Sequence, residues 1–101
     1  MKRQLHLNLF IQSRGHHEAS WRHPLASPLA LTDIRYFQEL ARRAEEGLFD
    51  SIFLADTLSV WEDVERVGRT WLEPMTVLGA LAVTTQRIGL IATASTTYSE
   101  P

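Results

Sequence analysis

The sequence predicts an α/β protein built on a parallel sheet, and two observations carry this prediction. Three segments have the apolar patterns of strands, at 5–11, 49–55 and 88–92. Each pair of successive strands is separated by a segment of helical periodicity, at 34–46 and from residue 73 onward. A strand-helix-strand-helix-strand order gives a parallel sheet with right-handed crossovers.

The first strand is expected to be only partly buried. Leucine occupies every second position from Leu5 to Leu9, with polar residues between, and Phe10 and Ile11 follow. A polar loop then runs over 12–31. A loop of about twenty residues without secondary structure is unusual in a compact domain and is commonly functional or disordered.

The first helix has recognisable signals at both ends. Thr32 is expected to cap it, with Asp33 in its first turn. Gly47 is expected to end it in the left-handed conformation. One face of this helix is apolar: Ile34, Phe37, Leu40, Ala41 and Ala44.

The second strand, 49–55, is a continuous apolar run that suits a strand covered on both faces. Asp56 follows at its carboxyl end, and a loop over 57–72 contains Trp61 and Trp71.

The second helix is expected to begin at Glu73-Pro74, since proline is well tolerated at a first helical position. Gly79 and Ala80 are expected to allow close packing on the sheet. The predicted apolar side of this helix consists of Met75, Leu78, Leu81 and Ala82.

Composition excludes several classes of protein. The 101 residues are 45% hydrophobic and 22% charged, as in a globular chain. A net charge of -2 without a basic run argues against nucleic acid as a partner. There is no cysteine. A signal peptide is not recognised and no apolar stretch approaches the ~20 residues that span a bilayer, so we expect a soluble cytoplasmic protein with no membrane partner.

The predicted elements are too few for a closed architecture. A barrel and a doubly wound sheet both need more than three strands and two helices, so we expect residues 1–101 to be a single partial domain, the N-terminal portion of something larger. Its sheet edge and helix face would be uncovered. We therefore expect aggregation, a homo-oligomer or association with further chain.

Candidate site residues lie where the strands end, because ligands bind beyond the carboxyl ends of parallel strands. Asp56 is either a turn cap or a ligand-binding group. The hydroxyl-rich segment 93–97 is either a solvated loop or the wall of a site for a flat aromatic ligand. His23, beside Trp21 and Arg22, either lines a pocket for an anionic or aromatic substrate or is simply exposed.

Other motifs give no assignment. The run His16-His17-Glu18 matches no helical metal-ligand spacing, so no metal is assigned. Phosphate-loop, dinucleotide and nucleophile-elbow patterns do not occur in the sequence.

Four blocks taken together resemble a known family. They are Ala-Ser-Trp-Arg-His-Pro at 19–24, the segment 36–56 ending in Ile-Phe-Leu-Ala-Asp, Leu-Glu-Pro at 72–74, and 88–101 with Ala-Thr-Ala-Ser-Thr-Thr-Tyr. In this order they resemble the bacterial-luciferase-like flavin monooxygenases, in the branch of nitrilotriacetate monooxygenase component A and the dibenzothiophene sulfone monooxygenases.

The resemblance implies a (β/α)₈ TIM barrel, of which this chain would form roughly the first three strands. It also implies a two-component flavoprotein oxidoreductase. In such systems an NAD(P)H-dependent flavin reductase supplies reduced FMN, which with O₂ oxidises a small organic substrate, often with cleavage of a C–N or C–S bond.

The resemblance also implies roles for particular residues. Asp56 and Thr93 match positions that contact FMN at the ends of the second and third strands. The neighbouring wall would include Ala55, Ala94 and Ser95. The substrate side would include Phe10, Trp21 and His23. It assigns no catalytic acid or base, and the family's phosphate-binding residues come from segments that follow position 101.

Two alternatives to the FMN monooxygenase stay open at this stage. One is a deazaflavin-dependent oxidoreductase on the same barrel. The other is a truncated, non-catalytic flavin-binding or assembly fragment, and even within the monooxygenase family the 101 residues alone are expected to be inactive.

Overall fold

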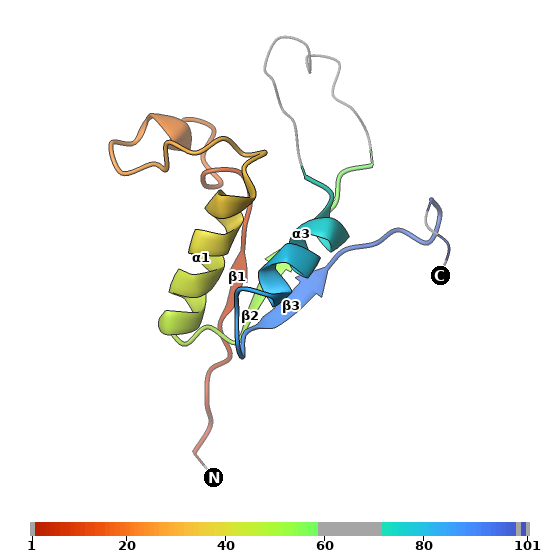
Figure 1. Cartoon of the computed structure of the whole chain (residues 1–101). Coiled ribbons are helices and arrows are strands. Elements are labelled where there is room, and N and C mark those ends of the chain that lie inside the picture. Colours follow the sequence, from red (N-terminus) through yellow and green to blue (C-terminus); the bar gives the residue numbers. More distant parts are fainter. Residues whose placement is uncertain (1, 59–71, 99, 101) are drawn as a thin grey trace.

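The computed structural model describes residues 2–58, 72–98 and 100. Along the chain they form β1 (Asn8–Phe10), a short 3-10 helix η1 (Ser20–Arg22), α1 (Ile34–Glu46), β2 (Ser51–Leu54), α3 (Pro74–Ala82) and β3 (Gly89–Ala92) (Figure 1). The predicted positions of Trp61 and Trp71 in a loop lie outside the described residues.

The three strands form one parallel sheet in the order β1-β2-β3, which confirms the predicted architecture. Leu9 lies opposite Ile52, and Ile52 lies opposite Leu90. Two right-handed crossovers that step in the same direction leave both helices on one side of the sheet, as Figure 1 shows.

The two faces of the sheet differ in what covers them. Leu9, Ile52 and Leu90 belong to the core beneath the helices, where Ile52 is fully buried. Phe10, Phe53 and Ile91 are paired in register and lie on the opposite face, because side chains alternate along a strand. The rings of Phe10 and Phe53 are 5.1 Å apart, and Ile91 is 45% exposed.

The strands are shorter than the sequence predicted. The predicted strands spanned 5–11, 49–55 and 88–92. The observed strands span Asn8–Phe10, Ser51–Leu54 and Gly89–Ala92. Leu5 is 89% exposed, so the alternating leucines do not mark a buried strand along their whole length. The loop over 12–31 is also not free of secondary structure, because it contains η1.

Both ends of α1 differ from the prediction by one residue. Asp33, not Thr32, is the cap, and its side chain accepts a hydrogen bond from the Arg35 backbone N–H at 3.0 Å. Gly47 has φ −77°, and Leu48 takes the left-handed conformation with φ 61°. Gly47 still donates its N–H to Arg43 at 2.9 Å, so the helical bonding continues through it and the chain reverses one residue later.

The start of α3 is confirmed, but its predicted buried face is wrong in part. Glu73 caps the helix, and Pro74 occupies its first turn. The buried side chains are Pro74, Val77, Leu78 and Leu81, which follow the spacing set by that start. Met75 is 58% exposed and Ala82 is exposed. Gly79 faces open space and does not pack on the sheet.

Glu45, near the end of α1, fixes the segment that enters β3. Its carboxylate accepts hydrogen bonds from three successive backbone N–H groups, those of Gln86, Arg87 and Ile88, at 2.6 to 3.1 Å. The bonds from Arg87 and Ile88 are the main causes that hold the pKa of Glu45 below its ordinary value of 4.5.

A further structural observation concerns membranes. None of the helices in the part of the chain that the structure describes is long and apolar enough to cross a bilayer.

Replacing Glu45 with glutamine should make the fold less stable near neutral pH. A carboxyl group whose pKa is lowered by folding stabilises the fold above its unfolded pKa, and this contribution is lost as the pH falls through the folded pKa. The thermal midpoint of Glu45→Gln should therefore lie below that of the parent at about pH 7, and the gap should close as the pH falls below 4.5 and through the lowered folded pKa. Thermal unfolding followed by circular dichroism measures this difference.

Glu46→Gln, at an exposed position on the same helical turn, is the matched control and should leave the midpoint nearly unchanged. A gap for Glu45→Gln that is the same at every pH would contradict the role given to its charge.

Candidate functional site

The carboxyl ends of the three strands lie together at one edge of the sheet. In Figure 1 the chain leaves β1, β2 and β3 at this same end, opposite the N-terminus. The backbone N–H of Ile11 donates to Phe53 at 3.2 Å, and that of Thr93 donates to Leu54 at 3.1 Å. These two hydrogen bonds continue the sheet ladder beyond the strands. They hold the first residues of the loops after β1 and β3 in place.

A cavity of about 450 Å³ opens at this edge. Its walls come from the end of β1 at 10–13, the end of β2 at 54–57 and the start of α3 at 72–74, completed by Leu31, Phe37 and Val77. Ligand pockets typically occupy ~300–1,000 Å³ and are mostly apolar with a few polar groups. This cavity, which we call the strand-end cavity, fits that description.

Among the described residues, two carboxylates line the strand-end cavity, and their hydrogen bonds differ. Glu73 is committed to the helix, because it accepts bonds from the backbone N–H of Met75 and from both the N–H and the hydroxyl of Thr76. The Met75 bond is the largest of the causes that lower the pKa of Glu73. Asp56 is exposed and accepts a bond from the N–H of its own neighbour Thr57 at 2.9 Å, which leaves acceptor capacity for a ligand.

Tyr36 supports the floor of the loop after β1, and the sequence did not reveal this role. Its hydroxyl donates to the carbonyl oxygen of Ser13, a lining residue, at 2.7 Å. Ser13 has φ 51°, a left-handed conformation that is uncommon outside glycine. Burial is the main cause that raises the pKa of Tyr36. The sequence offered one hint that Tyr36 is buried: it lies one helical turn before Leu40, next to the apolar face of α1.

The structure brings together three of the residues singled out by sequence. Phe10, Ala55 and Asp56 all line the strand-end cavity. Thr93 adjoins it through the bond to Leu54, and it is exposed. The described residues that line the cavity do not include Thr93 or the two residues after it, Ala94 and Ser95.

Ala94 and Ser95 lie in the segment after β3, where the contacts are local. The Ser95 hydroxyl accepts a bond from the N–H of Thr97, and its carbonyl accepts one from the N–H of Tyr98, both at 3.3 Å. Ser95 therefore begins a turn over 96–98, and Ala94 lies between this turn and β3.

Trp21 and His23 lie apart from the strand-end cavity. Trp21 is 58% exposed, with the Arg22 guanidinium carbon 5.0 Å from its ring centre. His23 lines a second hollow formed within the loop after β1. Within residues 2–58, 72–98 and 100, no three histidine, aspartate or glutamate side chains are grouped so as to hold a metal ion.

An open parallel sheet with a cavity at its carboxyl edge is the arrangement of a barrel-type ligand site. The chain belongs to the luciferase-like monooxygenase family, whose pattern matches residues 5–101. It is 52% identical over 100 residues to N-acetyl-S-(2-succino)cysteine monooxygenase of Bacillus subtilis (strain 168), covering 99% of this chain and 23% of the relative.

Further relatives agree with this family. The chain is 40% identical over 111 residues to nitrilotriacetate monooxygenase component A of Aminobacter aminovorans, covering 98% of this chain and 24% of that one. It is 36% identical over 112 residues to a dibenzothiophene-sulfone monooxygenase of Rhodococcus erythropolis (strain XP), and the match covers 99% of this chain and 24% of that relative.

The fold also matches a solved structure, riboflavin lyase with modified FMN and its substrate riboflavin. The TM-score is 0.79 at 26% identity, over 97% of this chain and 24% of that one. The chain thus spans about a quarter of the length of the proteins it matches. The predicted resemblance to the luciferase-like monooxygenases is confirmed, as is the fold class.

Replacing Tyr36 with phenylalanine should destabilise the chain by about 1 kcal/mol, because a part-buried carbonyl of Ser13 loses its donor. Urea unfolding measures this change. The amide of Gly15, which donates to Gln12 in the same turn, should also exchange its hydrogen faster.

Tyr98→Phe removes the same hydroxyl from an exposed ring and should change neither quantity. Equal effects of the two substitutions would show that the hydrogen bond from Tyr36 to Ser13 does not stabilise the fold.

Proposed function

We propose that this chain supplies the first three strands of a two-component, FMN-dependent monooxygenase. The observation that carries the proposal is the strand-end cavity, in which Phe10, Ala55 and Asp56 come together at the carboxyl edge of a parallel sheet. Family membership and the FMN in the structural neighbour support a flavin as the ligand.

The residues present fit a flat flavin ring. Phe10, Leu31 and Leu72 offer partly exposed apolar surface, and the small side chain of Ala55 lets a planar group approach the backbone. Asp56 offers a carboxylate for the polar edge of the ring. Thr93, beside Ala55 in the continued ladder, places a hydroxyl at the same edge, with Ala94 and Ser95 beyond it.

Reduced FMN, when bound, supplies the electrons with which O₂ is activated. The chain's own residues would bind and orient the ring through Asp56 and Thr93. The apolar lining residues Phe10, Leu31 and Leu72 would keep water away from the reacting face.

The proposed substrate is a small organic molecule oxidised at a C–S or C–N bond. Two relatives are named for N-acetyl-S-(2-succino)cysteine, a thioether, and for nitrilotriacetate, an amine. Phe10, Trp21 and His23 are proposed to face this substrate. The name "component A" supports a partner component, which we propose to be an NAD(P)H-dependent flavin reductase in the cytoplasm.

Titration of the labelled chain with FMN, followed by amide chemical shifts, tests the proposal. Shifts should concentrate at 10–13, at 54–57 and at Thr93. The affinity should be weaker than micromolar, because three strands supply only part of the wall. Ala55→Trp should abolish these shifts, since the indole would occupy the space over the backbone of the exposed Ala55 without disturbing the core.

Ala82→Trp adds the same side chain at an exposed position at the end of α3, far along the helix from the cavity-lining Pro74, and should leave the FMN shifts intact. Shifts that survive Ala55→Trp, or that concentrate elsewhere, would rule out the strand-end cavity as the flavin site.

A further inference from the structure

The loop between β1 and α1 forms a second hollow, separate from the strand-end cavity, that is shallow, open to solvent and rich in side chains that donate hydrogen bonds. Its volume is about 620 Å³. The lining side chains that carry polar groups are Arg14, His17, Ser20, Arg22 and His23. None of the described residues that line it is acidic. We call it the basic loop pocket.

Both histidines present a donor to solvent. The Nδ1 atom of His17 accepts the N–H of Ala19, and the Nδ1 atom of His23 accepts the N–H of Leu25, each at 3.1 Å. A ring nitrogen that accepts a hydrogen bond is unprotonated, so the proton of each neutral ring lies on Nε2. The backbone of the loop therefore selects the tautomer whose N–H donor is at Nε2.

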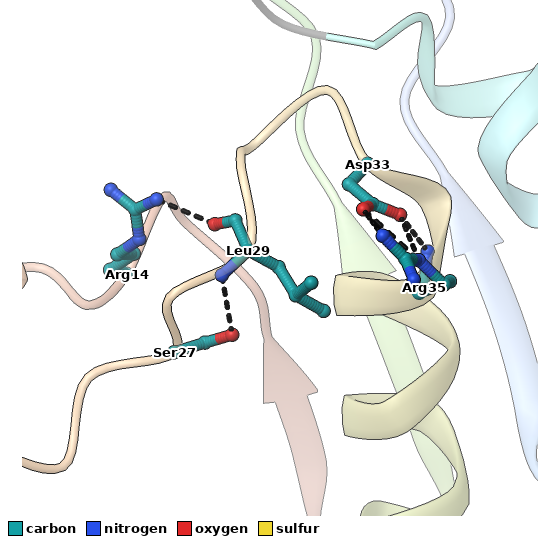
Figure 2. A network of polar contacts seen from close by, with 5 residues as sticks. All are labelled: Arg14, Ser27, Leu29, Asp33 and Arg35. Atoms are coloured by element: carbon teal, nitrogen blue, oxygen red, sulfur yellow. Dashed lines mark hydrogen bonds and ion pairs between the residues drawn. The ribbon is translucent and has the colours of Figure 1, made fainter.

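Arg14 is held in place and left short of acceptors. One terminal nitrogen donates to the carbonyl of Leu29 at 2.5 Å, and the other points away from Leu29 in Figure 2. Leu29 is fixed from its other side, since its N–H donates to the Ser27 hydroxyl at 3.3 Å. The buried Nε of Arg14 has no hydrogen-bond partner within the described part of the chain. A buried donor without an acceptor is costly. The Nε itself is not exposed, so a bound oxyanion would pair with the rest of this guanidinium, which lines the pocket.

The backbone around Arg14 is built for this placement. Ser13 and Gly15, on either side of it, have φ values of 51° and 127°. A Cβ at Gly15 would lie 2.7 Å from the Ser20 hydroxyl oxygen, so only glycine lets the turn close against η1. Arg22 is oriented separately, by the Trp21 ring beneath its guanidinium.

We propose that the basic loop pocket binds the carboxylate groups of an anionic substrate. Two guanidinium groups and two imidazole N–H donors, with no acid among them, match a molecule carrying more than one carboxylate, because guanidinium forks pair with carboxylates. The inference rests on the proposed function only in naming the anion a substrate. Binding of the anion itself needs no flavin.

Titration of the full chain with citrate, without flavin, tests the proposal. Amide shifts should appear at Arg14, Ser20 and Arg22 and at the indole N–H of Trp21. Arg22→Gln should weaken citrate binding about tenfold, because a charge-assisted hydrogen bond is lost. Arg22→Lys keeps the charge but loses the two parallel N–H donors of the guanidinium, so its citrate affinity should lie between those of the parent and Arg22→Gln. Arg22 is exposed, so these variants are expected to fold, and Arg14→Gln serves as a second variant.

Arg42→Gln removes the same charge from an exposed position on α1 and is the matched control. An equal loss in Arg42→Gln would reduce the effect to net charge and overturn the proposal. Equal binding of the neutral ester triethyl citrate would overturn it too.

The experiment also separates a carboxylate from a phosphate. Tighter binding of inorganic phosphate than of citrate, together with displacement of citrate by FMN, would assign the pocket to the flavin phosphate and overturn a substrate role. FMN shifts at the strand-end cavity are read in the same samples. A failure of citrate binding is thereby distinguished from a failure of the flavin site.

Discussion

The arrangement of the sheet depends on two carboxylates at its amino end. Glu45 accepts three successive backbone N–H groups and so fixes where β3 begins. Asp50 accepts the N–H of Leu7 at 2.7 Å and so holds the chain that enters β1, while its own carbonyl accepts the N–H of Gly89 at 2.8 Å. A Cβ at Gly89 would lie 3.1 Å from that carbonyl, so a larger residue would require the strands to shift by a few tenths of an ångström, and glycine favours this close approach. Both outer strands are thereby placed relative to β2.

Because these carboxylates place the strands from the amino end of the sheet, the opposite edge is available for binding. Stability at the amino end comes from side-chain carboxylates bonded to backbone, and the strand register then carries the placement along to the carboxyl ends. There, within the described residues, Asp56 accepts a hydrogen bond from its neighbour's N–H alone and so keeps acceptor capacity. The oxygens of Glu73, in contrast, accept hydrogen bonds from α3. Two acids that look alike in the sequence thus differ in role, in the manner expected of a parallel sheet with a ligand edge.

Periodicity was sufficient for the order of elements and for the residues that end strands, because both depend on local pattern. Asp56 was found this way, whereas Phe10 was assigned to the site only by the resemblance to the family. Caps were misplaced by one residue, since Thr32 and Asp33 have similar intrinsic preferences and the choice depends on the Arg35 contact. Glu45 and Tyr36 were missed for a different reason. Their partners lie 41 or more and 23 residues away, and no local pattern encodes such contacts.

One turn connects the two hollows of the molecule. Ser13 lines the strand-end cavity and Arg14, the next residue, lines the basic loop pocket. The left-handed conformation of Ser13 makes this possible, because it redirects the chain between two adjacent side chains, and the Tyr36 hydroxyl holds that conformation through the Ser13 carbonyl. A flavin in one hollow and an anionic group in the other would then be set at a fixed separation by a single turn. On the proposal that the basic loop pocket binds an anion, the loop after β1 has a physical reason for its length, because it must form that pocket and still return to begin α1.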